Sequence, residues 1–238
     1  KTGCRVKEVT VNKRGLANGV IYYDEKGVVK EQKATVVVLA CNGVGTPRLL
    51  LNSVSPIFPN GLANRSGLVG RNLMFHPVAI VEGVFEEKLQ GFKGPISCSI
   101  TSYEFYETDA SRGFVRGSQL QVNRSEGPVH VSLGSGAAGN RVPWGEEHHR
   151  IFSNRMGRTI RVAVMGEDLP ELSNVVELDD QMSDSNGVPS PKINYSESEN
   201  SKKLIKFGVD RAVEVLDAAG AKSVLHDPLL RAAGWHLM

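Results

Sequence analysis

The sequence predicts an α/β (α+β) fold in which a glycine-loop unit accompanies a second, mostly antiparallel β-sheet domain. Three observations lead to this prediction. Short β-type segments separated by Asn, Asp and Gly turns open the chain. A continuous apolar run then leads into a glycine loop and a helix start. Further short β-type segments recur through the middle of the chain, as in an antiparallel domain.

Residues 1–75 are expected to form the first region. Residues 5–11 and 19–23 carry the β-type pattern, and the turn sequence Asn-Lys-Arg-Gly lies between them. Residues 35–40, Thr-Val-Val-Val-Leu-Ala, are apolar on both faces, which favours a strand covered on both sides, as in a parallel sheet. The glycine loop follows, and Thr46 and Pro47 suit an N-cap and a first helical turn.

Residues 76–198 form a second region, rich in glycine, serine and aromatic residues. A short helix or turn is expected to begin within residues 143–149. The remaining candidates in this region are strands, expected at residues 78–85, 119–122, 129–133, 159–165 and 175–178.

The third region, residues 199–238, opens with a helix. The sequence Ser-Glu-Ser-Glu at 196–199 is a capping-box pattern, and Gly220 stands where a C-terminal cap belongs. Between them, apolar residues recur at spacings of three and four, so one stripe of the helix is expected to face a core. These residues are Leu204, Ile205, Val209, Ala212, Val213 and Leu216.

Charge and composition exclude several classes of partner. The formal net charge is +2, and no long basic run occurs, so we expect neither nucleic acid nor an acidic membrane surface as a partner. The longest apolar run is far shorter than the ~20 residues that span a bilayer. The chain begins with Lys1 rather than Met, so we expect its natural N-terminus to lie upstream, and the sequence leaves its localisation unknown.

The glycine loop is the first candidate site. A helix N-terminus offers unpaired N–H groups and partial positive charge, which suit a phosphate or the edge of a flavin. Gly43 and Gly45 would allow a ligand to approach the backbone, but the third glycine of the dinucleotide fingerprint is absent. A plain chain reversal is therefore the competing interpretation.

Histidines are the second group of candidates. His236 could accept a proton near neutral pH, as alcohol oxidation requires, and a structural or surface histidine is the alternative. His148 and His149 are adjacent and would point in different directions from a helix, so we expect no metal site. Cys4, Cys41 and Cys98 form no C-x-x-C motif and are expected to be free thiols.

Four stretches, in this order, resemble segments of the glucose–methanol–choline (GMC) family of FAD-dependent oxidoreductases. Residues 37–53, VVLACNGVGTPRLLLNS, are similar to the family's second signature, and residues 67–77, GLVGRNLMFHP, to its VGRNLMDHP segment. Residues 165–178 resemble the entry from the substrate domain to the C-terminal half. Residues 234–238, GWHLM, resemble the start of the family's HxxGT motif. Together they cover nearly the whole chain.

The resemblance implies an FAD-binding domain built from separate segments, with an inserted substrate-binding domain. Residues 1–75 would be part of the first, residues 76–198 the second, and residues 199–238 a helix and the start of the active-site segment. Val6 matches a position whose backbone contacts the adenine of FAD, and the loop near the cofactor is matched by Ala40, Asn42, Gly43, Thr46 and Pro47. His236 matches the histidine that takes the hydroxyl proton of an alcohol or sugar while hydride passes to flavin N5.

The sequence also departs from the family's pattern. The N-terminal Gly-x-Gly-x-x-Gly is absent, as is a second histidine or asparagine after His236, and Phe75 replaces the usual Asp. By itself the chain is therefore expected to bind FAD weakly or not at all and to be inactive. Likeness to gluconate and fructose dehydrogenases implies a quinone or cytochrome as electron acceptor. The alternative is a non-catalytic α/β binding or scaffold domain.

Overall fold

The computed structural model describes residues 1–94, 98–124, 127–133, 142–226 and 231–237, and for the last of these segments it describes the backbone. The chain divides into two compact units. Unit 1 is made of Lys1–Met74 and Pro170–Ser196 with the last residues of the chain, and unit 2 of Phe75–Leu169 and Glu197–His236. These boundaries differ from the expected regions, because residues 170–196 pack with the N-terminal part and the long helix packs with the middle part. Which unit binds cofactor or substrate stays a prediction.

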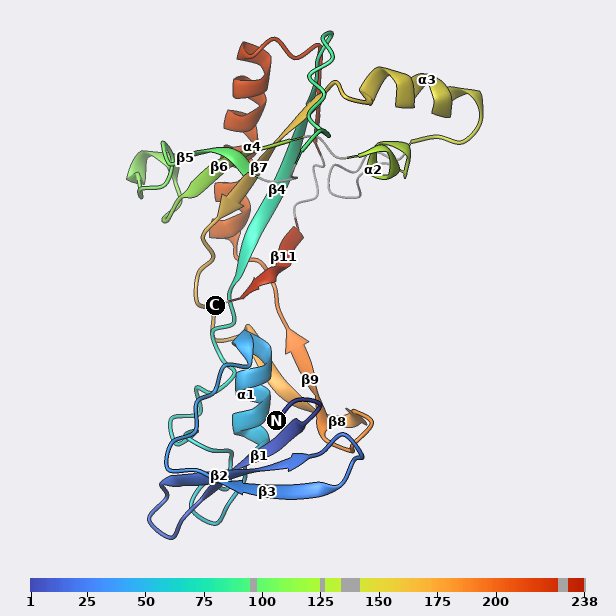
Figure 1. Ribbon diagram of the computed structural model, residues 1–238. Coiled ribbons are helices and arrows are strands. Elements are labelled where there is room, and N and C mark those ends of the chain that lie inside the picture. The colour runs from blue at the N-terminus through green and yellow to red at the C-terminus, as the bar shows by residue number, and fades with distance from the viewer. Residues whose placement is uncertain (95–97, 125–126, 134–141, 227–230, 238) are drawn as a thin grey trace. The chain divides into compact units, whose positions relative to one another are not determined.

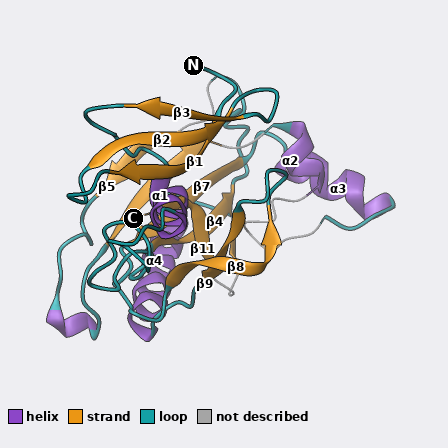
Figure 2. Cartoon of the chain, turned by 90° about the horizontal axis from the view of Figure 1, so that it is seen from below, coloured by secondary structure: helices purple, strands orange, loops and turns teal. Residues whose placement is uncertain are grey.

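Unit 1 contains an antiparallel three-stranded sheet in the order β1-β2-β3 (Figures 1 and 2). Its strands are β1 (Arg5–Val11), β2 (Ala17–Tyr23) and β3 (Val29–Lys33). The turn between β1 and β2 is closed by Asn12, whose side-chain oxygen accepts from the N–H groups of Arg14 and Leu16. Gly15 in this turn has φ +77°, the left-handed region that glycine enters without a Cβ penalty.

Helix α1 (Asn42–Asn52) and the hairpin of β8 (Val175–Ser183) and β9 (Pro189–Asn194) complete unit 1. The helix contacts β1 as well as both strands of the hairpin. Ser53, just after the helix, is buried: its hydroxyl donates to the Leu49 carbonyl and accepts from the Val9 N–H. The end of α1 is thereby attached to β1.

The predicted strand at residues 35–40 is wrong. Residues 36–40 form no strand, and Val36 and Val38 are 74% and 83% exposed. An apolar segment becomes a buried strand only if neighbouring strands take up its N–H and C=O groups. No strand of the described part of the chain pairs with this segment.

Unit 2 is built on a six-stranded sheet of order β10-β4-β7-β6-β5, with β11 also pairing with β4. The neighbours β4, β7 and β6 pair antiparallel over most of their length. Shorter helices and a 3-10 turn lie between the strands. The elements are β4 (Phe75–Val84), β5 (Cys98–Ser102), η1 (Ala110–Arg112), β6 (Ser118–Arg124), α2 (Pro128–Leu133), α3 (Glu146–Arg155), β7 (Thr159–Gly166), β10 (Ser223–His226) and β11 (Arg231–Leu237).

Helix α4 (Glu199–Ala218) covers one face of this sheet (Figure 1). The predicted stripe is confirmed: Leu204, Ile205, Val209, Ala212 and Leu216 are buried in the core, and Val213 packs against it. The helix passes so close to the sheet that a Cβ added at Gly208 would lie 2.3 Å from Val164 Cγ1. As the capping pattern predicts, Ser198 Oγ accepts from the Ser201 N–H at 3.0 Å.

On the other face of the sheet, Glu82 and Arg161 form an ion pair of Oε2 to Nε distance 3.0 Å. They are direct cross-strand partners in β4 and β7, and both are almost fully buried. Their neighbours Val81 and Val162 belong to the core under α4, so strand alternation directs the pair to the opposite face.

Two further findings concern the helices. The predicted strand at residues 129–133 is wrong, since these residues belong to α2, where Pro128 supplies a φ suited to the first helical position. The helix or turn predicted within 143–149 is confirmed as the start of α3. Within the described residues, no helix is both long enough and apolar enough to cross a bilayer.

Candidate functional site

The N-terminus of α1 brings together five of the six predicted cofactor-binding residues: Ala40, Asn42, Gly43, Thr46 and Pro47. The helix begins five residues earlier than the sequence predicts, so Thr46 is not its N-cap. Cys41 occupies the cap position and provides no side-chain hydrogen bond to the helix.

Asn42 supplies the missing cap from inside the first turn. Its backbone has φ +60°, and its Oδ1 accepts from the N–H groups of Val44 and Gly45 at 2.9 and 3.0 Å. Asparagine tolerates this left-handed conformation better than most residues. Because Oδ1 is fixed by two donors, Nδ2 is held in place, and it donates no hydrogen bond to any described residue. The exposed Asn42 amide is thus a donor available to a ligand.

The electrostatics of this turn suit an electron-rich ligand. The first turn of α1 carries no acidic residue, so the positive end of the helix dipole is not neutralised by its own side chains. Gly45 keeps the turn tight, since a Cβ there would lie 3.1 Å from Cys41 Cβ. Pro47 has no N–H to donate to the Gly43 carbonyl, so that carbonyl lacks its usual helical partner.

Val6, the sixth predicted cofactor residue, lies toward the other end of α1. It belongs to the edge strand β1 and is 41% exposed. The carbonyl of the neighbouring Lys7 accepts from Asn52 Nδ2 at 2.9 Å, at the last residue of the helix. From the rise per residue of an α-helix, Val6 and Asn42 are on the order of 15 Å apart. A ligand that contacts both must therefore be elongated.

Arg48 anchors α1 to the β8–β9 hairpin. Its Nε donates to the Pro189 carbonyl at 2.7 Å, and its Nη2 donates to the Val188 carbonyl at 3.0 Å and to Asp184 Oδ2 at 2.9 Å. Arg5 also reaches Asp184 Oδ2, at 3.0 Å. This set fixes the roll of the helix, and hence the direction in which its N-terminal turn faces.

The Gly-Leu-Val-Gly-Arg-Asn stretch, residues 67–72, borders a cavity of about 460 Å³ within unit 1. Gly70 has φ +83°, and a Cβ there would lie 2.1 Å from the Val176 carbonyl oxygen. The Gly70 carbonyl accepts from the Val176 N–H at 2.7 Å. No site residue was predicted in this stretch, although Gly67 and Gly70 are a local signal for a close approach of the backbone.

His236 lies in β11, which pairs with β4 of unit 2. The position of its side chain lies outside the part of the molecule that the structure describes. Its role as the predicted proton acceptor therefore stays a prediction. Among the described residues, no group of three or more His, Cys, Asp or Glu is placed to hold a metal ion.

Comparison with known proteins identifies the family. Residues 1–78 match the family described as GMC oxidoreductase. The chain belongs to this family. FAD is the family's cofactor, as the resemblance implied.

Several relatives align with nearly the whole of this GMC oxidoreductase chain. It is 40% identical to 2-methyl-1,2-propanediol dehydrogenase from Mycolicibacterium austroafricanum over 245 aligned residues, which cover 100% of this chain and 43% of that protein. It is 26% identical to the fructose dehydrogenase large subunit from Gluconobacter japonicus, covering 88% of this chain and 38% of that protein. The chain thus spans less than half the length of these relatives.

A solved structure confirms the fold. Formate oxidase superimposes with a TM-score of 0.58 at 16% identity, over 93% of this chain and 44% of that one. At this identity the likeness establishes the mixed α/β architecture alone. It agrees with the predicted combination of cofactor-domain pieces and an antiparallel sheet.

The α1 turn fits an FAD. It offers an exposed amide donor at Asn42, an unneutralised helix N-terminus and a tight glycine turn that a Cβ would crowd. Val6 lies far enough away for one elongated dinucleotide to contact both places. The free cysteines Cys41 and Cys98 are exposed, and Cys4 is half-buried.

Proposed function

We propose that the protein is an FAD-dependent oxidoreductase that oxidises a CH–OH group of an alcohol or sugar. The observation that carries the proposal is the 40% identity, over the whole chain, to a diol dehydrogenase. Small branched diols are therefore the first substrates to test. The exposed N-terminal turn of α1, which carries no acidic residue, supports a ligand site and disfavours the alternative of a cofactor-free scaffold.

In this proposal α1 binds one edge of the cofactor. Asn42 Nδ2 donates a hydrogen bond to it, and the N-terminal turn around Gly43, Thr46 and Pro47 places partial positive charge beside it. The exposed Ala40 allows close approach, and the backbone at Val6 contacts the adenine end. When bound, FAD supplies the hydride acceptor at flavin N5.

The proposal gives His236 the role of proton acceptor. A neutral imidazole beside the substrate hydroxyl removes its proton as the carbinol carbon loses hydride, so that charge does not accumulate on the oxygen. A quinone or cytochrome is proposed as the electron acceptor. The dehydrogenase names of two relatives support this choice over oxygen.

The test uses the full-length protein and anaerobic stopped flow. We expect a flavin absorption spectrum and its bleaching by 2-methyl-1,2-propanediol, with His236→Ala slowing flavin reduction by about 10²–10⁴-fold. His149→Ala, at an exposed position of α3, is the control, and its flavin should be reduced at the wild-type rate.

Two results would refute the proposal. A full-length protein that binds no flavin would refute the enzymatic function. Flavin reduction at an unchanged rate and with an unchanged pH profile in His236→Ala would remove the role of that residue. Reduction of a quinone analogue but not of oxygen by the reduced enzyme is expected for the proposed acceptor.

A further inference from the structure

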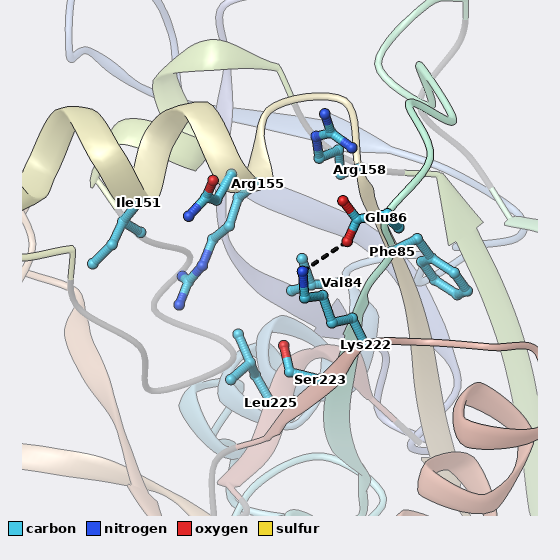
Figure 3. Close-up of a pocket in the computed structure, with 10 residues that line it drawn as sticks. Val84, Phe85, Glu86, Ile151, Arg155, Arg158, Lys222, Ser223 and Leu225 are labelled. Atoms are coloured by element: carbon cyan, nitrogen blue, oxygen red, sulfur yellow. Dashed lines mark hydrogen bonds and ion pairs between the residues drawn. The ribbon is translucent and has the colours of Figure 1, made fainter.

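A cavity of about 440 Å³ lies in unit 2, between α3, the end of β4 and β10 (Figure 3). None of its lining residues is among the predicted cofactor-binding or catalytic residues. Its volume falls within the range typical of small-molecule sites. Its walls divide into a charged part and an apolar part, the latter formed by Val84, Phe85, Ile151 and Leu225.

The charged part is unbalanced. Arg155, Arg158 and Lys222 line the cavity against one carboxylate, Glu86. Glu86 is already engaged, since Lys222 Nζ donates to its Oε2 at 2.7 Å. The hydrogen bond from Lys222 is the main cause that lowers the pKa of Glu86, and the charge of Arg158 adds to it. Lys222 is thus paired with Glu86, whereas Arg155 and Arg158 form no ion pair with any residue that the structure describes.

Both guanidinium groups have unused donors. Within the described residues, Arg155 forms no ion pair or side-chain hydrogen bond, and Arg158 acts on Glu86 through charge without a hydrogen bond. Figure 3 shows Arg155 extending from α3 into the space near Ile151 and Leu225. Both arginines are half-buried, so part of their hydration has already been removed. Guanidinium groups in this state favour carboxylate and phosphate partners.

The backbone fixes the two arginines relative to each other. Helix α3 ends at Arg155, and Gly157 reverses the chain with φ +73°. The Arg158 N–H donates to the Arg155 carbonyl at 2.9 Å, and the Arg158 carbonyl accepts from the Phe85 N–H at 2.8 Å. On the opposite wall, the Lys222 N–H donates to the Val84 carbonyl at 2.7 Å. The cationic groups are therefore carried by a hydrogen-bonded frame rather than by free loops.

We infer that this cavity binds a small organic anion with two negative charges and a compact apolar body, such as a phosphate monoester or a dicarboxylate. The guanidinium groups of Arg155 and Arg158 bind the anionic group, and the Ser223 hydroxyl adds a further donor. The apolar body packs against Ile151 and Leu225. None of these residues has a role in the proposed flavin chemistry.

Calorimetric titration of the full-length protein with phenyl phosphate tests the inference directly. We expect saturable binding with a Kd of about 1 mM or tighter, weakening as NaCl is raised. Inorganic phosphate should bind more weakly, because it cannot fill the apolar part. Phthalate, a compact aromatic dicarboxylate, should compete with phenyl phosphate. Binding of inorganic phosphate as tight as that of phenyl phosphate would overturn the assignment of the apolar half.

Variants locate the site. Arg155→Gln and Arg158→Gln should each weaken phenyl phosphate binding by about tenfold. Arg150→Gln is the matched control, because Arg150 lies on the same helix but is exposed and paired with Glu147. An equal loss in Arg150→Gln would show general charge attraction and overturn the inference.

Glu86→Gln gives a test that misfolding cannot imitate. Removing the carboxylate frees Lys222 and takes away a negative charge, so binding should tighten by about fivefold. Unchanged or weaker binding in this variant, or no saturable binding by the wild type, would refute the site. These measurements do not require bound flavin, so they remain informative if the proposed oxidoreductase function fails.

Discussion

Arg48 Nη2 lies 2.9 Å from Asp184 Oδ2, and this contact joins the helix that carries the candidate cofactor turn to the β8–β9 hairpin. The Asp184 carboxylate also accepts from the N–H groups of Asn186 and Val188. Removal of Asp184 would therefore leave the half-buried Arg48 without its anionic partner and would loosen the hairpin turn. One carboxylate thus contributes both to the attachment of α1 and to the closure of the hairpin turn.

The first prediction concerns how the free energy of unfolding changes at acid pH. Desolvation by itself would raise the pKa of Asp184, but hydrogen bonds from Asn186, Arg48 and Val188 and the charge of Arg5 outweigh it and lower that pKa. The folded protein thus keeps this carboxylate ionised to lower pH than the unfolded chain, whose Asp pKa is about 3.9. The stabilisation is present above that unfolded pKa and is lost as pH falls through the folded pKa.

Asp184→Asn should therefore lower the free energy of unfolding at pH 7 by about 2 kcal/mol, with a smaller difference from wild type below about pH 4. Urea unfolding of the chain at a series of pH values measures this. Asp180→Asn, an exposed position in the same hairpin, should leave the profile unchanged. A difference between Asp184→Asn and wild type that does not vary with pH would contradict the proposed cause.

Sequence reasoning recovered those elements whose local pattern alone specifies them. The expected strands are observed as β1, β2, β4, β6 and β7, with alternating burial at the start of β4 and of β6. Helix α4 carries both its cap and its apolar stripe. By contrast, β3 has the sequence VKEQK and is exposed throughout, so no hydrophobic signal marks it. The hairpin strand β9 begins Pro-Ser-Pro, which argues locally against a strand.

The candidate site was predictable only in part, for the same reason. The glycine loop is visible as a local motif, yet the helix begins at Asn42 because its side chain caps the turn, which residue preference alone did not indicate. The contact between Arg48 and Asp184 joins residues separated by 136 positions. No local pattern encodes that pairing. The prediction for residues 35–40 was wrong for a different reason. Their local pattern is that of a buried strand, but a strand forms there only if partner strands accept and donate its backbone hydrogen bonds.

The second prediction concerns the loss of stability on replacing Gly70 by alanine. Gly70→Ala combines a left-handed φ with a Cβ placed against the Val176 carbonyl, so the chain must shift and the hydrogen bond between Val176 N–H and Gly70 carbonyl is strained. Gly67→Ala is the matched control: its φ is +70°, but a Cβ there meets nothing within 4 Å. We expect Gly67→Ala to cost about 1–2 kcal/mol from φ alone, and Gly70→Ala to cost at least about 2 kcal/mol more.

The comparison is made by urea unfolding at neutral pH. Similar losses in the two variants would show that the close approach to Val176 is relaxed at little cost. A larger loss in Gly70→Ala should be accompanied by faster hydrogen exchange at the Val176 amide, because that amide donates to Gly70.

Glu197, at the start of α4, gives the third prediction. Its Oε1 is buried and accepts no hydrogen bond within the described residues. Desolvation is the main cause that raises the pKa of this carboxyl, and the charge of Asp168 raises it further, while Lys202 opposes both. Asp168 is itself held by the Ser201 hydroxyl at 2.7 Å and cannot turn away. The folded state therefore binds a proton at Glu197 more tightly than the unfolded state does.

The sign of the effect follows from this difference in proton affinity. Stability is highest below the unfolded Glu pKa of about 4.3 and declines as pH rises through the folded pKa, where an unpartnered charge forms. Glu197→Gln removes that charge, so it should be more stable than wild type at pH 7 by less than about 1 kcal/mol, since half-burial leaves partial screening by water. The gain in stability should vanish near pH 4.

Glu199→Gln, two residues on, is the control. The hydrogen bond from Lys202 lowers the pKa of Glu199, so removal of this carboxylate cannot stabilise the protein. A destabilised Glu197→Gln at pH 7 would show that the carboxylate of Glu197 has a partner in solution, and thermal unfolding of both variants at the two pH values decides the matter.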